Sequence, residues 1–249
     1  MKKMNKLRIL LYMFVAVFTL NSCTDEVDPQ DTPYITFETS SMDITFDQGG
    51  SITQEVKVYA ANTSNQERTV GIAVVGASTD VDAAAYVVPT TVTFAAGSNV
   101  AVLNIDLTDV NMSPFTSQTL VVSITNAPEI YTGEDLTINV GLRCPNNGVK
   151  VKMVLGFDSW PEEVYWRLVD VNAGVIVLAS NPTPAYGAYA GMTGGITIQE
   201  CVPSGDYQLQ IFDGYGDGGT SYVVTADGVQ VANVSASSYG GSTSVDFSI

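Results

Sequence analysis

The run from Val100 to Thr108, VAVLNIDLT, alternates apolar and polar residues as a half-buried β-strand does. One face of such a strand would carry four apolar side chains: Ala101, Leu103, Ile105 and Leu107. The alternation is clean from Leu103 onward, because Val102 shares the second face with the polar residues. Successive side chains of a strand point to opposite faces. The run therefore predicts a strand that buries one face in a core and exposes the other to water.

Runs of this kind recur along the chain between clusters of turn residues, and no segment after residue 22 shows a sustained helical period. In the first half the expected strands are 34–39, 42–47, 52–60, 69–76, 90–95, 100–108, 118–125 and 135–142. In the second half they are 150–157, 164–170, 174–180, 195–199, 206–212, 220–226, 229–234 and 243–249. The sequence predicts an all-β fold of two antiparallel β-sandwich domains in tandem.

The strand pattern breaks at Cys144–Gly148, CPNNG, where turn residues follow one another. We expect a first domain over 34–143, a linker over 144–149 and a second domain over 150–249. Within the second domain, Asp227-Gly228 lies between two β-rich runs and predicts a type I′ hairpin turn.

The N-terminal segment has the pattern of a secretory signal. Basic residues precede an apolar run over 9–20, which is shorter than the about 20 residues that a membrane-spanning helix needs. Leu20-Asn21-Ser22-Cys23 resembles the lipobox of bacterial lipoproteins, in which the signal is cut before a cysteine that then carries lipid. The resemblance implies a cleaved lipoprotein signal peptide over 1–22 and lipidation of Cys23. An ordinary secreted protein with a stray cysteine is the alternative.

Residues 23–33 contain four acidic residues, no basic residue and little that is apolar. A segment of this composition cannot bury enough surface to fold, so we expect a flexible tether. It resembles the acidic stretch behind the lipidated cysteine in surface-displayed lipoproteins of Bacteroidota. The resemblance implies a lipid anchor in the outer membrane with the protein at the cell surface, and a periplasmic orientation stays open.

The net charge of the protein limits which partners it can bind. The formal net charge is −16, and loss of the four n-region cations leaves 6 Lys and Arg against 26 Asp and Glu, or about −20. Phosphate backbones bind through cations that displace their counterions, so nucleic acid is excluded as a partner. The same charge repels anionic headgroups, and membrane contact is expected through the lipid anchor alone.

The chain contains no histidine, which excludes Ser-His-Asp and Cys-His catalysis and the usual zinc sites. Two cysteines remain beyond Cys23, namely Cys144 and Cys201. In an oxidising compartment an even remainder suggests a disulfide, and two reduced, buried cysteines are the alternative.

The first domain resembles a Calx-beta module, a calcium-associated β-sandwich. The resemblance lies in Ala85-Tyr86, in Thr91–Ser98 (TVTFAAGS) and in Leu103–Asp109 (LNIDLTD). Where that family continues with an acidic cluster, this chain has Asp109–Ser113, DVNMS, although Asp80 and Asp82 are near in sequence. The resemblance therefore implies the fold for this domain and not a metal site.

The second domain has a distinctive glycine-rich loop, Asp213–Gly219, DGYGDGG. Two carboxylates four residues apart, with glycines that let backbone carbonyls approach, suit Ca²⁺. The alternative is a hairpin turn whose aspartates cap backbone N–H groups. Together with Phe157–Leu168 and Cys201–Tyr207, the loop resembles a β-sandwich appendage of secreted Bacteroidota proteins. We hypothesise that Asp158, Asp213 and Asp217 converge on one Ca²⁺.

Aromatic residues near this loop could contact a glycan. The candidates are Trp160, Tyr215 and Tyr239, and Tyr165 and Trp166 extend the set. Because Tyr165 and Trp166 are adjacent in an expected strand, they point to opposite faces. We expect one of these two to belong to the core.

These observations favour a non-catalytic, lipid-anchored envelope protein that binds or adheres at the cell surface, with an unknown glycan or protein as ligand and with structural calcium. An accessory subunit of an uptake or secretion complex is the alternative. A glycoside hydrolase that uses two carboxylates is a further rival, but Glu162 and Glu163 are adjacent and would diverge on a strand.

Overall fold

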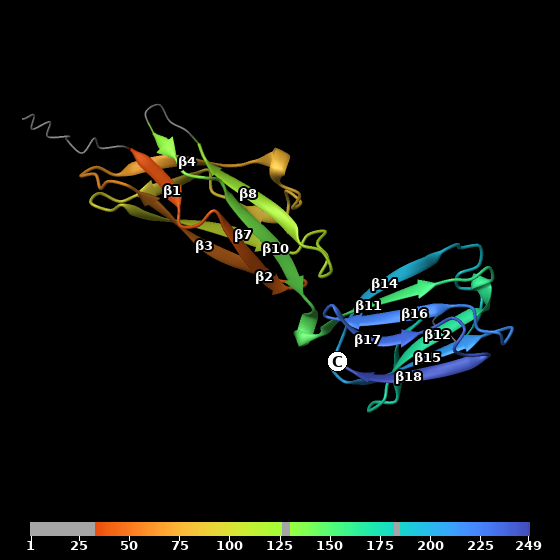
Figure 1. Ribbon diagram of the computed structural model, residues 1–249. Helices are drawn as coiled ribbons and strands as arrows, with labels where there is room; N and C mark the ends of the chain where they lie inside the picture. The colour runs from red at the N-terminus through yellow and green to blue at the C-terminus, as the bar shows by residue number, and fades with distance from the viewer. Residues whose placement is uncertain (1–32, 126–129, 182–184) are drawn as a thin grey trace, which may run out of the picture.

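The computed structural model describes residues 33–125, 130–181 and 185–249. The expected signal peptide (1–22), the lipidation site Cys23 and the tether up to residue 32 lie outside the described residues. The described strands form four sheets that pair into two sandwiches, and Figure 1 shows these end to end. The all-β prediction, with two sandwiches in tandem, is confirmed.

The N-terminal sandwich consists of two five-stranded sheets. In spatial order the first sheet contains β5 (Tyr86–Val87), β7 (Val100–Thr108), β3 (Ser51–Ala60), β1 (Tyr34–Phe37) and β9 (Tyr131–Thr132). The second contains β2 (Ser41–Asp47), β10 (Leu136–Arg143), β8 (Gln118–Ile124), β4 (Arg68–Val74) and β6 (Thr91–Phe94). A short 3₁₀ helix, η1 (Gly76–Ser78), follows β4.

Strand β7 has the burial pattern that its sequence predicts. Its four apolar inward-facing residues are buried, while its other residues are exposed. Leu103 pairs with Val56 and Ala101 with Val58 of β3, and both valines are buried as well. These residues belong to one continuous core formed by both sheets, in which each fully buried Leu or Ile contributes about 1.5–3 kcal/mol.

Two strand pairs of the N-terminal sandwich are parallel, which differs from the expected antiparallel arrangement. β10 runs parallel to β2, and β1 runs parallel to β9. Parallel neighbours require a long crossover connection. Here most of the domain separates β2 from β10, so the last strand returns beside one of the first.

The C-terminal sandwich consists of two four-stranded sheets in which every neighbouring pair is antiparallel, as expected. One sheet contains β14 (Gly195–Val202), β11 (Val149–Gly156), β16 (Ser221–Ala226) and β17 (Val229–Val234). The other contains β13 (Val175–Ala179), β12 (Val164–Asp170), β15 (Asp206–Asp213) and β18 (Ser242–Ser248). Asp227 and Gly228 have φ values of 46° and 83°, as the predicted type I′ turn between β16 and β17 requires.

The junction between the sandwiches is short, and a disulfide begins within it. β10 ends at Arg143, a 3₁₀ helix η2 (Pro145–Asn147) follows, and β11 begins at Val149. Cys144 forms a disulfide with Cys201 of β14, and their Cα atoms are 5.5 Å apart. Because β14 pairs with β11, the disulfide ties the start of the C-terminal sandwich to its own edge strand.

We expect Cys144→Ser with Cys201→Ser to destabilise the C-terminal sandwich. The bond closes a loop with a sequence separation of 57 residues, for which loop entropy gives about 4 kcal/mol. The chain's two tryptophans, Trp160 and Trp166, both lie in this sandwich, so tryptophan fluorescence during urea unfolding reports on it selectively. Wild type in a reducing agent should match the double variant, whereas an unchanged unfolding midpoint in both would contradict the prediction.

Candidate functional site

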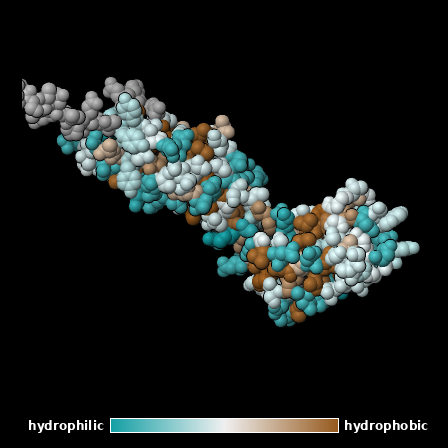
Figure 2. Space-filling view, in the orientation of Figure 1, coloured by the Kyte–Doolittle hydropathy of each residue, from teal (hydrophilic) through white to brown (hydrophobic). Residues whose placement is uncertain are grey.

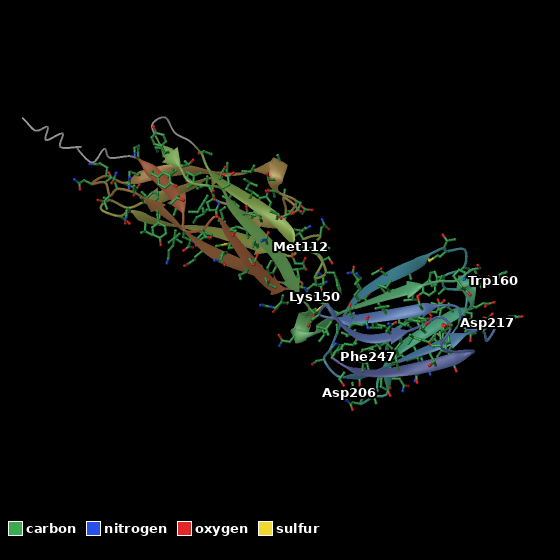
Figure 3. The ribbon with its side chains drawn as sticks, viewed as in Figure 1. Met112, Lys150, Trp160, Asp206, Asp217 and Phe247 are labelled. Carbon is green, nitrogen blue, oxygen red and sulfur yellow. A yellow bond between two sulfur atoms is a disulfide. The ribbon has the colours of Figure 1, made fainter. Side chains whose placement is uncertain are left out.

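Two loops meet at one end of the C-terminal sandwich. The connection from β11 to β12 includes the 3₁₀ helix η3 (Pro161–Glu163), and the connection from β15 to β16 is the glycine-rich loop. The amide of Gly214 donates to the carbonyl of Glu163 at 2.8 Å and joins the two loops. Figure 3 shows Trp160 and Asp217 at this end, away from Lys150 at the junction. We call this end of the sandwich the tip.

Asp213 ends β15 and is only 6% exposed. Among the residues that the structure describes, it is the only charged one that is buried. Its Oδ1 accepts hydrogen bonds from the amides of Gly216 and Asp217, the latter at 3.2 Å. The sequence alternative, an aspartate that caps backbone N–H groups, is therefore realised at Asp213.

Backbone conformation and close approach explain two of the loop's glycines. Gly218 and Gly219 have φ values of 91° and 97°. A Cβ at Gly218 would lie 2.5 Å from the carbonyl oxygen of Tyr239, a backbone atom, so glycine is required there by both conformation and space. A Cβ at Gly219 would meet the carboxylate of Asp158, a side chain that can move, so the positive φ is the reason for glycine at that position.

Three carboxylates meet at the tip. Oxygen atoms of Glu163, Asp213 and Asp217 all lie within 4.8 Å of one another. The structure thus brings together two of the three hypothesised ligands and adds Glu163, which the sequence reasoning considered only as a catalytic candidate. Asp158 is beside the loop, against Gly219, and its Oδ1 accepts a hydrogen bond from the amide of Trp160 at 2.8 Å.

The electrostatics of the tip are strongly negative. Burial is the largest cause that raises the pKa of Glu163, and repulsion by Asp213, Asp217, Asp158 and Glu162 raises it further. Within residues 33–125, 130–181 and 185–249 there is one ion pair, and it joins Arg143 to Asp47 in the N-terminal sandwich. The carboxylates of the tip are therefore not neutralised by a basic side chain.

The donor set fits a hard cation. Glu163, Asp213 and Asp217 offer carboxylate oxygens and neither nitrogen nor sulfur. Ca²⁺ takes 6–8 oxygen ligands from carboxylates, backbone carbonyls and water in flexible geometry. The residues present could hold Ca²⁺, and a bound ion would supply the positive charge that the cluster lacks.

The candidate glycan-contact residues differ in their exposure. Trp160 and Tyr215 are 59% and 78% exposed on the two loops of the tip. Tyr239 is half-buried, packs against the core and donates its hydroxyl to the carbonyl of Thr220 at 2.8 Å. Burial is the largest cause that raises the pKa of Tyr239 to about 12, and Asp213 adds to it. Trp160 and Tyr215 are thus the two that face solvent openly.

Trp166 belongs to the core, as expected for one of these two residues, and Tyr165 is also buried, on the opposite face of β12. Trp166 lies between the sheets, and its indole Nε1 donates to the hydroxyl of Tyr189 at 2.8 Å. Tyr165 is on the other face of β12, where its ring packs against Phe212 with 5.6 Å between centroids. Strand alternation alone could not show that Tyr165 is buried on this outer face.

Three aspartates of the N-terminal sandwich accept hydrogen bonds from backbone amides. Oδ1 of Asp82 accepts from the amide of Ala84, Asp80 accepts from the amide of Thr119, and Asp109 accepts from the amide of Gly49. Within the described ranges, the one group of three or more potential ligands close enough to share a metal ion is the tip trio.

No known protein family and no curated protein matches the chain. A multidomain protein including DUF1735 from Bacteroides ovatus is 14% identical over 87% of this chain and 95% of its own, with a TM-score of 0.39. An auxiliary nutrient binding protein from Bacteroides thetaiotaomicron is 10% identical over 92% and 96%, with a TM-score of 0.37.

The CBD12 structure from CALX1.2 is 11% identical over 72% of this chain and 81% of its own, with a TM-score of 0.37. Similarities at this level identify no function for the chain. Among the residues that the structure describes, no helix has the length and apolarity to cross a bilayer.

Glu163→Gln should change the melting temperature in opposite directions without and with calcium. In a chelator the variant should melt at a higher temperature than wild type, because a carboxylate beside Asp213 and Asp217 has become neutral. In calcium the order should reverse, because saturation at 100 times the Kd stabilises wild type by about 2.7 kcal/mol. Thermal unfolding in EGTA and in millimolar Ca²⁺ measures both.

Glu162→Gln is the matched control, since Glu162 is adjacent and outside the trio. This variant should keep the calcium-dependent rise in melting temperature. A wild type whose melting temperature is the same in EGTA and in calcium would contradict the prediction.

Proposed function

We propose that the protein is a non-catalytic, lipid-anchored envelope protein that binds ligands at the cell surface through its C-terminal sandwich, with Ca²⁺ as a structural ion. One observation carries the proposal. The exposed rings of Trp160 and Tyr215 lie on the two loops that supply the carboxylate trio. An ion bound there would fix both loops, and with them the rings that contact a glycan or a protein.

The arrangement of the chain fits display of this tip. The expected anchor at Cys23 precedes β1, which begins at Tyr34 in the sandwich that lies away from the tip (Figure 1). An extended tether over residues 23–33 would span up to about 35 Å. Both sandwiches and the tether would then separate the tip from the membrane.

The surface of the C-terminal sandwich fits a binding role better than that of the N-terminal sandwich. Of the exposed large hydrophobic residues that the structure describes, nine lie in the C-terminal sandwich and five in the N-terminal one. Figure 2 shows hydrophobic residues taking a larger share of its visible face. The larger number of exposed apolar side chains supports an interaction surface on this domain.

The chemistry of the chain supports the proposal of a non-catalytic role. It contains no histidine, and the carboxylates of the tip adjoin one another as the ligands of a cation do. Hydrolysis of a polysaccharide by the purified protein, abolished by Glu163→Gln, would replace this proposal with a carboxylate-based glycosidase.

Lipidation of Cys23 is tested by mass spectrometry of the protein extracted from cell envelopes. The N-terminal peptide of wild type should begin at Cys23 and carry acyl chains, and several acyl chains give stable anchoring. Cys23→Ala should lose the acyl chains and leave the membrane fraction. Recovery of wild type from the soluble fraction, with an unmodified Cys23, would contradict the proposal.

Ligand binding through the tip is tested on arrays of glycans and extracellular matrix proteins, in calcium and in EGTA. Wild type should bind in calcium, and Trp160→Ala with Tyr215→Ala should weaken binding by about tenfold or more, because exposed aromatic rings are typical interface anchors. Tyr131→Ala, an exposed aromatic of the other sandwich, is the matched control and should bind normally. Equal binding by all three proteins would contradict the role of the tip.

A further inference from the structure

The outer face of the β13-β12-β15-β18 sheet carries an ordered row of planar polar side chains. Strand alternation points Gln208, Gln210 and Phe212 of β15 away from the core, because Leu209 and Ile211 between them are buried. Across the sheet, Gln210 pairs with Arg167 of β12 and with Ser244 of β18. Gln208 pairs with Asp246 of β18. The row therefore crosses three strands.

Hydrogen bonds connect this row from end to end. Nε of Arg167 donates to Oε1 of Gln210 at 2.6 Å. Nε2 of Gln210 donates to Oε1 of Gln208, and Nε2 of Gln208 donates to Oδ1 of Asp246 at 2.8 Å. Each glutamine uses one N–H and one lone pair in the row, and so keeps one N–H and one lone pair for a ligand. The amide planes are held in place before any ligand arrives.

Two adjoining hollows lie over this face and share Phe212. One has a volume of about 250 Å³ and is lined by Tyr165, Arg167, Ala185, Tyr186 and Phe212. The other has a volume of about 300 Å³ and is lined by Gln208, Gln210, Phe212, Ser242, Thr243 and Ser244. Both hollows are open to solvent, as a site that binds along a polymer chain must be.

The aromatic part of the face is firmly placed. The guanidinium of Arg167 lies over the ring of Phe212, 5.5 Å from its centroid, and the ring of Tyr165 packs against Phe212 from β12. Tyr186, which is exposed, borders the first hollow. The first hollow thus offers apolar ring surface, and the second offers amides and hydroxyls.

We propose that this face is a second binding site, adjoining the tip but distinct from its carboxylates and its exposed rings, and that it binds a neutral oligosaccharide. A sugar ring can place its C–H groups on an aromatic surface, which the first hollow offers. Its hydroxyls can hydrogen-bond to fixed amides, which the second hollow offers. From Gln208 to Phe212 the strand extends about 13 Å at about 3.3 Å per residue, which suits a chain of sugars rather than one ring. Arg167 and Asp246 balance each other in charge, and the carboxylates at the tip disfavour an anionic polysaccharide.

Affinity electrophoresis tests the site. Native gels would contain laminarin, mannan or xylan as neutral probes, and polygalacturonate as an anionic probe. Wild type should be retarded by at least one neutral probe and not by polygalacturonate. Gln208→Ala with Gln210→Ala should weaken that binding by about tenfold or more, because the fixed hydrogen-bond partners are lost. Gln230→Ala, an exposed glutamine on β17 of the opposite sheet, should bind as wild type does.

The tip variant, Trp160→Ala with Tyr215→Ala, separates this site from the proposed function. Loss of retardation in the Gln208 and Gln210 variant, whether or not the tip variant also loses it, supports the site. Loss in the tip variant alone would overturn it and leave the proposed function standing. Retardation by none of the neutral probes, or by polygalacturonate most strongly, would also overturn it. Circular dichroism confirms that each variant is folded.

Discussion

The buried carboxylate of Asp213 is the constraint on which the tip of this protein depends. A charge removed from water is costly unless it is paired or hydrogen-bonded, and Asp213 receives only backbone amides from Gly216 and Asp217. Those bonds fold the glycine-rich loop back on β15 and place Asp217 beside Glu163. The loop gains its shape from the same contacts that concentrate negative charge, and this is the basis for the proposed cation.

The sheet that contains β15 positions the tip. Strand β15, which ends in Asp213, lies between β12 and β18 and exposes Gln208, Gln210 and Phe212 on its outer face. The tip and the sheet face therefore meet at consecutive residues, Phe212 and Asp213. At the other end of the sandwich, the disulfide of Cys144 fixes the point where the chain enters.

Most of the fold could be predicted from the sequence because alternation and turn residues encode it directly. All sixteen expected strands form, three of them with the expected ends and the others with shifted ends, whereas β5 and β9 were missed because two residues show no period. Sequence patterns also do not encode which distant strands lie side by side, so the parallel pairing of β2 with β10 was missed. Asp213 and Asp217 could be found from their spacing in one loop. Glu163 could not, because η3 brings it to them from another loop, and neither could the burial of Tyr165.

The central claim, that the carboxylates at the tip hold Ca²⁺, is tested most directly by two-dimensional ¹H–¹⁵N NMR of the folded chain during a calcium titration. The amides of Gly216 and Asp217 donate to Asp213 and report on its charge. They should shift together and saturate, while amides beside Asp80 and Asp109 in the N-terminal sandwich should not move. Unshifted loop amides, or equally small shifts beside every exposed carboxylate, would contradict the claim.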